Sequence, residues 1–426
     1  MRNKRLITLL GSVCLIVVLA ALPFMAACPA PVEEECVTDA DCPEGYICVN
    51  GVCVPEKEPL EGPIKIGALV PLTGGLAHYG PHTKAAIEVA LDEVGWEVAG
   101  RPIELIIEDD ASFDEVIALQ KARKLVEADK VDVLMGPIGS SSFLGTETYI
   151  DVKQIPTFAI GYRGELKEWE EPGWDFANSG GLAQIDYQAG LWAYEQGYRT
   201  AVTMGPDYET GYQGCGAFAD AFTKAGGKVL QQLWSPVGTT DYAPYFSAMP
   251  EADVMAMFQY GAGVVSFVKQ WHEFGYWDKM PLLLLMPDSL QESSLAELGD
   301  FTIGLHAATN YSWTVDNPVN NKFVPAFEAK TGIKPDCMCF PAYTGATFFL
   351  EIMKKTNGDT TPEAIRDALF GMTVDSISGP VTFDGEKGYS RINTFITEVQ
   401  KIDGRLVYQV IKTYHDTVNP GYYTKP

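Results

Sequence analysis

The sequence predicts an α/β protein of two doubly wound lobes, each a parallel sheet with helices on both faces. The chain has 426 residues, which is too long for one ordinary core. Residues 64–70 form an apolar, strand-like run that ends at Pro71, and a glycine-rich loop then leads into a helical pattern. Short apolar runs and helical patterns alternate after it, and strands separated by helices of this length form parallel βαβ units.

The first lobe starts with the strand over residues 64–70 and the loop over residues 73–80. Its other predicted strands and helices follow in order: 103–108, 113–128 (helix), 131–135, 141–153 (helix) and 156–160. The first loop lacks the glycine spacings of nucleotide-binding motifs, so it does not indicate a nucleotide. Ligands of open α/β sheets bind beyond the carboxyl ends of the strands, so the loops after these strands are the candidate binding loops.

A second series follows the glycine-rich residues 178–181. Its predicted elements are helices over 184–196, 211–225 and 264–274 and strands over 200–204, 228–233, 254–258 and 280–286. Residues 311–318 are expected to cross back, before helices over 320–331, 343–355 and 362–369, the last with Thr361 as N-cap. Asp403-Gly404 between two apolar runs predicts a hairpin. Lobes connected in this way can close over a cleft.

The resulting organisation has several parts. It comprises a signal peptide (1–27), a cysteine-rich spacer and linker (28–63), lobe one (64–180 and 310–394), lobe two (181–309) and a return to lobe two with a tail (395–426). The formal net charge is −25, which disfavours nucleic-acid binding because that function needs basic patches.

The N-terminus has the pattern of an export signal. Basic residues Arg2, Lys4 and Arg5 precede an apolar run over residues 6–22. The small residues before Cys28 are similar to a bacterial lipobox, which predicts a lipidated Cys28 and an extracytoplasmic protein attached to the membrane. Met25 departs from the leucine that this pattern prefers. An uncleaved anchor helix is the alternative, and it places the rest of the chain on the same side.

Four cysteines follow in a short polar segment: Cys36, Cys42, Cys48 and Cys53. An even number of cysteines in an exported segment predicts two disulfides, whose pairing stays open, and a zinc site is the alternative. Cys215, Cys337 and Cys339 lie further along the chain, and a disulfide between Cys215 and one of the other two also stays open.

Polar strand-end loops supply the candidate ligand-binding residues. Ser140 and Ser141 stand where a helix begins, and helix N-termini bind anions such as a carboxylate. N-capping by either serine is the alternative. No G-x-S-x-G motif surrounds them, so a serine nucleophile is not indicated.

The second lobe offers a carboxylate and two aromatic loops. Asp288 ends an apolar strand and is either a partner for a cationic ligand group or a helix cap. Tyr208 and Tyr260 follow two other strands. His78 and His82 have a spacing that suits a metal on a helix, but Gly80 and Pro81 lie between them, so no metal site and no cofactor is predicted.

The motifs taken together resemble the Leu/Ile/Val-binding family of ABC-importer substrate-binding proteins. The resemblance runs in consistent order from about Ile64 to Thr413, through IKIGALVPLTGGLAHYG, IIEDDAS, VLMGPIGSSS, IPTFAIGYRGEL, GPDYETGY and FQYGAGVVSFVKQWHEFGY. It implies the type I periplasmic binding protein fold, in which three hinge strands join the lobes. It also implies a small-molecule ligand in the interlobe cleft and a permease partner.

The resemblance assigns roles to particular residues. It places ligand contacts on a set from both lobes: Tyr79, Ser140, Ile160, Tyr162, Tyr260 and Asp288. Ser140 would hold the ligand carboxylate and Asp288 its ammonium. The family commonly has threonine at Tyr162 and tyrosine at Thr210, where this chain has its tyrosine two places earlier, at Tyr208. Both departures reshape the pocket.

The sequence therefore predicts a non-enzymatic, lipid-anchored solute-binding protein for an amino acid or a related small polar ligand. A ligand-sensing receptor of the same fold and an extracytoplasmic hydrolase are the alternatives. Binding would close the lobes, because ligand contacts from both sides favour the closed state.

Overall fold

The computed structural model describes residues 36–43, 46–49, 51–55, 61–161, 173–259, 261–285, 290, 292–385 and 388–426. The chain divides into two compact units, Met1–Pro59 and Leu60–Pro426. The predicted signal peptide and Cys28 lie outside the described residues. Among the helices that are described, none is long and apolar enough to span a membrane.

The N-terminal unit is a small hairpin fastened by disulfides. A 3-10 turn, Asp39–Asp41, precedes the antiparallel strands β1 (Tyr46–Val49) and β2 (Val52–Pro55). Disulfides join Cys36 to Cys48 and Cys42 to Cys53. The structure thus contains the two predicted disulfides and resolves their pairing. The zinc alternative is wrong, because all four thiols are consumed in these bonds.

The first body of the larger unit is built on a six-stranded sheet, as counted over the described residues, with strand order β4-β5-β3-β6-β7-β8. These strands are β3 (Ile64–Val70), β4 (Glu97–Val98), β5 (Arg101–Asp109), β6 (Val133–Met135), β7 (Thr157–Phe158) and β8 (Asp175–Phe176). All neighbours pair in parallel except β4, which is antiparallel to β5. The predicted strand over residues 64–70 is therefore central, and its apolar side chains are fully buried.

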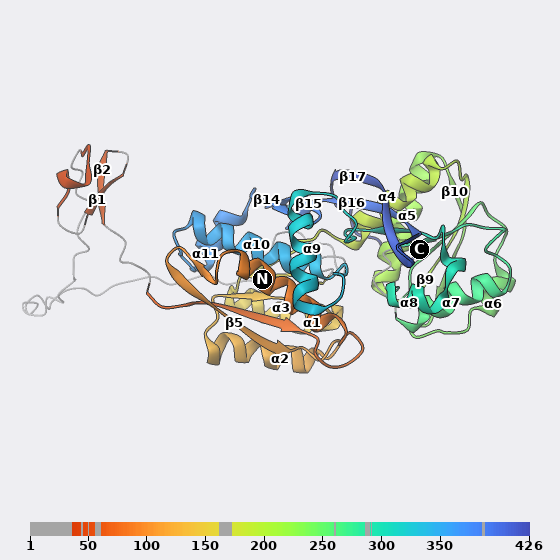
Figure 1. Cartoon of the computed structure of the whole chain (residues 1–426), viewed down its shortest axis with the longest axis horizontal. Helices are drawn as coiled ribbons and strands as arrows, with labels where there is room; N and C mark the ends of the chain where they lie inside the picture. The colour runs from red at the N-terminus through yellow and green to blue at the C-terminus, as the bar shows by residue number, and fades with distance from the viewer. Residues whose placement is uncertain are drawn as a thin grey trace, which may run out of the picture. The chain divides into compact units, whose positions relative to one another are not determined.

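Helices from distant parts of the chain cover this sheet (Figure 1). They are α1 (Tyr79–Glu93), α2 (Glu115–Arg123, continued by a π turn over Lys124–Asp129), α3 (Ser140–Lys153), α9 (Pro318–Thr331), α10 (Cys339–Lys355) and α11 (Pro362–Leu369). One hydrophobic core joins β3 and α1 to α9 and α10. Cys339 is buried in this core and Cys215 in a separate core of the second body, so the disulfide left open for Cys215 does not form.

Strands β9 to β13 of a second sheet form the second body, whereas β14 and β15 of the same sheet pack in the core of the first body. This sheet has the strand order β10-β9-β11-β12-β13-β16-β15-β14, with β17 paired to β16. Its strands are β9 (Thr200–Pro206), β10 (Lys228–Ser235), β11 (Val254–Met257), β12 (Leu282–Leu284), β13 (His306–Thr309), β14 (Thr373–Ser376), β15 (Gly379–Asp384), β16 (Tyr389–Ile402) and β17 (Arg405–Thr417). The helices of the second body are α4 (Leu182–Glu195), α5 (Glu209–Ala225), α6 (Ala243–Ala248), α7 (Ala262–Glu273) and α8 (Glu292–Leu298).

This sheet is only half parallel. Strands β9 to β13 run parallel, whereas β13 pairs antiparallel with β16, and β14 to β17 are antiparallel throughout. The predicted hairpin at Asp403-Gly404 is confirmed as the β16–β17 turn. The predicted α/β fold is confirmed, because strands β9 to β13 form the parallel part of this sheet. Its antiparallel half comes from residues that follow the last βα unit and return to the edge of the sheet.

Chain segments that pass between the bodies lie beside one another. Residues 177–181 lead from β8 to α4, residues 310–317 lead from β13 to α9, and β16 pairs with β15 near its start and with β13 further along. The backbone of Ala177 accepts a hydrogen bond from Ser390 N at 3.0 Å, and Ser378 Oγ donates to Asn310 O at 2.6 Å. These bonds hold the passing segments together.

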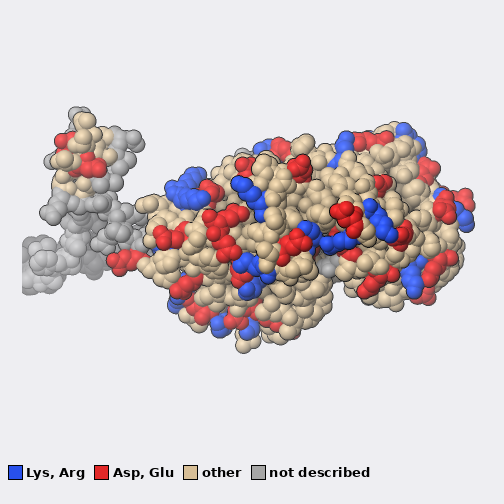
Figure 2. Space-filling view, in the orientation of Figure 1, with Lys and Arg blue, Asp and Glu red and all other residues tan. Residues whose placement is uncertain are grey.

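Acidic and basic side chains are mixed on the visible surface. In Figure 2, Lys and Arg are interspersed with Asp and Glu over the face shown. That face carries no broad basic patch among its described residues, in keeping with the net charge of −25.

Candidate functional site

The glycine-rich loop after β3 is held in place by Asp109 at the end of β5. Asp109 Oδ1 accepts hydrogen bonds from Leu72 N at 2.8 Å and Thr73 N at 3.2 Å, and Oδ2 accepts one from the Thr73 hydroxyl at 2.6 Å. Burial raises the pKa of Asp109, but the bonds from Thr73, Ala111 and Leu72 outweigh it and leave the pKa below its ordinary value. The carboxylate form is therefore the one that organises this loop.

The next residue, Asp110, is fully buried and connects two strand-end loops. Its carboxylate accepts hydrogen bonds from Ser112 N at 2.8 Å and from Ile138 N at 3.4 Å. Burial raises the pKa of Asp110 to about 6, although these two bonds act in the opposite direction. The backbone of the loop that leads into α3 is thus hydrogen-bonded to a desolvated carboxyl group.

Helix α3 begins with three serines, and none of them is its N-cap residue. The N-cap is Gly139, which makes no side-chain cap bond, so neither Ser140 nor Ser141 caps the helix. Both are half-buried, whereas Ser142 is fully buried and donates to Ser112 O at 2.6 Å. A Cβ on Gly139 would lie 2.0 Å from Ser112 O, so only glycine permits this close approach.

The second body meets α3 through Tyr208, at the N-cap position of α5. The Tyr208 side chain lies close enough to the Ser141 hydroxyl for the two groups to interact; burial raises the pKa of Tyr208, and the Ser141 hydroxyl lowers it. The structure therefore brings together two residues that the sequence assigns to ligand binding, one from each body. This contact is the centre of the candidate site.

The other predicted ligand residues differ in position. Tyr79 and Ile160 are 3% and 1% exposed, and both pack in the core of the first body. Tyr162, Tyr260 and Asp288 lie outside the described residues. Thr210, where the family commonly has tyrosine, is buried in the first turn of α5.

The two histidines near the start of α1 do not form a metal centre. His82 Nδ1 is bonded to Asp336, and the His78 ring lies 4.0 Å from the Tyr79 ring. Over the described residues, the cysteines Cys36, Cys42 and Cys53 are the one group close enough to hold a metal, and disulfides already occupy them.

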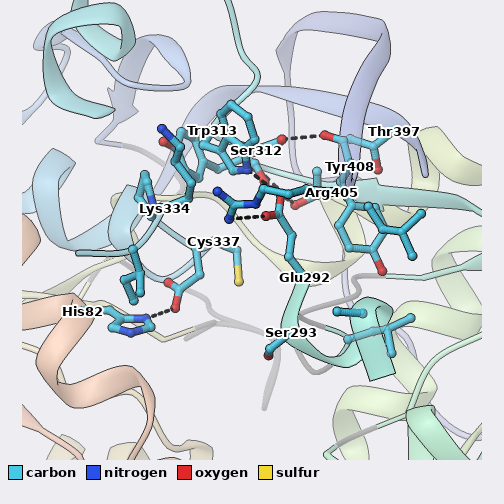
Figure 3. Close-up of a pocket in the computed structure, with 18 of the residues that line it drawn as sticks. His82, Glu292, Ser293, Ser312, Trp313, Lys334, Cys337, Thr397, Arg405 and Tyr408 are labelled. Carbon is cyan, nitrogen blue, oxygen red and sulfur yellow. Dashed lines mark hydrogen bonds and ion pairs between the residues drawn. The ribbon is translucent and has the colours of Figure 1, made fainter. Parts of the chain in front are cut away.

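A cavity of about 530 Å³ lies between the two bodies (Figure 3). The first body contributes the start of α1 and the α9–α10 loop, and the second contributes α8 and the β16–β17 turn. Its charged and aromatic lining residues are His82, Glu292, Asp300, Tyr311, Trp313, Lys334, Asp336, Arg405 and Tyr408. Sequence reasoning missed these residues as a site. Only the predicted crossing over residues 311–318 pointed to this place, and no motif joins it to Glu292 or Arg405.

Comparisons with known proteins agree with this geometry. Residues 63–404 match the family model described as "Periplasmic binding protein". The chain is 26% identical to Leu/Ile/Val-binding protein homolog 6 of Brucella melitensis, over 84% of this chain and 93% of that protein.

Two solved structures cover 84% of this chain and 99% of their own chains. An ABC transporter substrate-binding protein from Sphaerobacter thermophilus is 29% identical with a TM-score of 0.79. A solute-binding protein of an ABC transporter from Rhodopseudomonas palustris, in complex with 3,4-dihydroxybenzoic acid, is 27% identical with a TM-score of 0.76.

Proposed function

The chain belongs to the periplasmic binding protein family of ABC-transporter solute-binding proteins, and we propose that it delivers a small carboxylate-bearing solute to an ABC importer. An amino acid or a related compound is the proposed ligand. The observation that carries this proposal is the contact between Ser141 at the start of α3 and Tyr208 of the second body. A ligand in this position touches both bodies and therefore favours their closure, without covalent chemistry.

A carboxylate fits the start of α3 for a physical reason. The first backbone amides of a helix have no partner within the helix, and the helix dipole is positive at this end. Ser140 and Ser141 add two hydroxyl donors that are not used for capping. The ligands named for the similar proteins, branched-chain amino acids and a dihydroxybenzoic acid, share a carboxylate and differ in the amine.

An amine distinguishes an amino acid from a benzoic acid, and Asp288 would be the residue that recognises it. We propose that Asp288 accepts the ammonium of an amino acid, which makes the ligand a zwitterion held between the bodies. Losing this carboxylate would leave a desolvated ammonium unpaired, which costs about 2–5 kcal/mol. Tyr260 is a proposed neutral hydrogen-bond partner of the ligand, and losing its hydroxyl would have a smaller cost of about 1 kcal/mol.

The test is calorimetry with leucine, leucinamide and 3,4-dihydroxybenzoate on the wild type, Ser141→Ala and Asp288→Asn. We expect leucine or another amino acid to bind, leucinamide to bind poorly, and Asp288→Asn to weaken amino-acid binding at least thirty-fold. Ser141→Ala should weaken every carboxylate ligand. Binding of the dihydroxybenzoate with equal affinity to the wild type and Asp288→Asn would contradict the amino-acid assignment.

Membrane attachment is a separate proposal that rests on Cys28. We propose that Cys28 carries the lipid anchor, so that the binding unit acts at the outer face of the cytoplasmic membrane. Cys28→Ser should release the protein into the soluble fraction or leave it unprocessed. Membrane fractionation with mass spectrometry of the N-terminal peptide measures this, and a Cys28→Ser protein that is still cleaved there and still carries lipid would contradict it.

A further inference from the structure

The acidic groups of the interlobe cavity all have protein partners. Asp336 accepts bonds from His82 and from Met338 N, and both oxygens of Asp300 accept from Lys401 Nζ. Glu292 accepts a hydrogen bond from the indole N–H of Trp313. Each acidic group that lines the cavity therefore already accepts hydrogen bonds from within the protein.

One cationic group that lines the cavity is held much less firmly. Among the described residues, the nearest acidic oxygen to Arg405 is Glu292 Oε2, at 3.8 Å, which is too long for a hydrogen bond, and the Arg405 side chain is 59% exposed. A guanidinium has five N–H donors in a planar fork that suits a carboxylate. Figure 3 shows Arg405 and Glu292 extending toward each other into the space between the two bodies.

Trp313 gives the cavity a fixed aromatic wall. Its ring is held at the N–H by Glu292 of α8, and Lys334 Nζ lies 5.1 Å from the ring centroid. Glu292 belongs to the second body and Lys334 to the α9–α10 loop of the first, so the ring stands where the bodies meet. Tyr311 and Ile333 also line the cavity. A flat ligand can stack on such a wall.

We propose that this cavity is a second ligand site, for an organic anion whose carboxylate pairs with Arg405 and whose flat apolar body lies against Trp313. Its volume of about 530 Å³ is within the range of small-molecule sites. None of Ser140, Ser141 or Tyr208 lines it, so this site is distinct from the one at the start of α3. Occupying it would tie the two bodies together at a place away from that site.

Cys337 provides a local readout, because it lines the cavity and is partly exposed, whereas Cys215 and Cys339 are buried. The experiment measures alkylation of Cys337 by iodoacetamide in the full chain, by peptide mass spectrometry, with increasing 2-naphthoate or uncharged 2-naphthamide. Calorimetry on the same samples gives the affinities. The variants are Arg405→Gln and Ser141→Ala, with Arg391→Gln as the matched control. Arg391 is also an exposed arginine with one acidic partner, Asp416 at 3.3 Å, but it does not line the cavity.

Saturating 2-naphthoate should slow alkylation of Cys337 at least ten-fold in the wild type, Arg391→Gln and Ser141→Ala, and 2-naphthamide should not. Arg405→Gln should need on the order of ten-fold to a hundred-fold more 2-naphthoate for the same protection, because a hydrogen bond to a charged group is lost. Equal protection in Arg405→Gln and the wild type would overturn the proposal. Loss of protection in Ser141→Ala would overturn it too, because closure around the α3 site would then be what shields the thiol.

Discussion

At the scale of single residues, adjacent side chains in this protein have opposite electrostatic behaviour. Asp109 accepts several hydrogen bonds as a carboxylate, and its pKa is lowered; Asp110 is buried with fewer donors, and its pKa is raised to about 6. Asp109 ends β5 and Asp110 follows it. Asp109 holds the loop after β3, and Asp110 holds the loop that leads into α3. The two residues therefore predict opposite dependences of stability on pH.

The first prediction compares Asp110→Asn with the wild type. The folded-state pKa of Asp110, about 6, lies above the ordinary value of 3.8 for an aspartate, so the folded protein keeps a proton that the unfolded chain releases. The stability contributed by this proton is present below about pH 4 and is lost as the pH rises to 6. As the pH rises over this window, the wild type should lose stability relative to Asp110→Asn. The difference in their free energies of unfolding should change by up to about 3 kcal/mol in favour of the variant.

Urea unfolding between pH 4 and 7 measures this difference, and Asp109→Asn is the control. Because the pKa of Asp109 is lowered, its carboxylate stabilises the fold above its ordinary pKa, and that contribution is lost as the pH falls. Asp109→Asn should therefore be less stable than the wild type by about the same amount throughout the range from pH 4 to 7, because the contribution of Asp109 is lost only below its ordinary pKa. A constant difference between Asp110→Asn and the wild type across the pH range would refute the assignment.

At the scale of elements, the start of α3 depends on a close backbone contact. The loop over residues 136–139 carries a cis peptide bond at Gly136-Pro137 and packs against the loop after β5. Gly139 approaches Ser112 O so closely that a Cβ would be 2.0 Å from it, and Ser112 in turn accepts the bond from Ser142. The position of Ser140 and Ser141 is therefore set by a glycine outside the helix.

The second prediction is that Gly139→Ala displaces this loop. Overpacking of a tight site typically costs about 1–3 kcal/mol, so the midpoint of urea unfolding should fall and ligand affinity should fall with it. Gly75→Ala is the control, since a Cβ there meets only Phe113 at 3.7 Å, an ordinary contact. Equal stability and affinity of Gly139→Ala and Gly75→Ala would show that the contact does not position the helix.

At the scale of the whole molecule, the two bodies of the Leu60–Pro426 unit are both α/β and are joined by several connections. The chain passes between them through residues 177–181, residues 310–317 and β16. The hydrogen bonds between neighbouring connections hold them as a group, while the Ser141–Tyr208 contact and the cavity lie where the bodies face each other. Such an arrangement suits rotation of one body against the other.

The third prediction is that ligand binding compacts this unit. Small-angle scattering should show a smaller radius of gyration at saturating ligand than without it. Mass action should at the same time raise the free energy of unfolding by about 2.7 kcal/mol at a ligand concentration one hundred times the dissociation constant. A saturated protein with an unchanged radius of gyration would rule out closure, even if its thermal stability increased.

The sequence by itself determined the features that depend on short stretches of chain. The apolar run over residues 64–70 and the helical spacings after it predicted the βα order, because side-chain periodicity is a local property. The same logic located Ser141 and Tyr208 on strand-end loops, and the even number of cysteines in an exported segment predicted two disulfides. The β16–β17 hairpin followed from the dipeptide Asp403-Gly404.

Only the tertiary structure decided which distant segments meet. Its decisions include the pairing of Cys36 with Cys48, the antiparallel contact of β13 with β16, and the approach of Tyr208 to Ser141. Each joins residues whose partners no local pattern specifies. The interlobe cavity is the extreme case. Its lining residues come from separate elements, among them Glu292, Trp313, Lys334 and Arg405. They form one site because the chain passes repeatedly between the two bodies, which brings these elements together where the bodies meet.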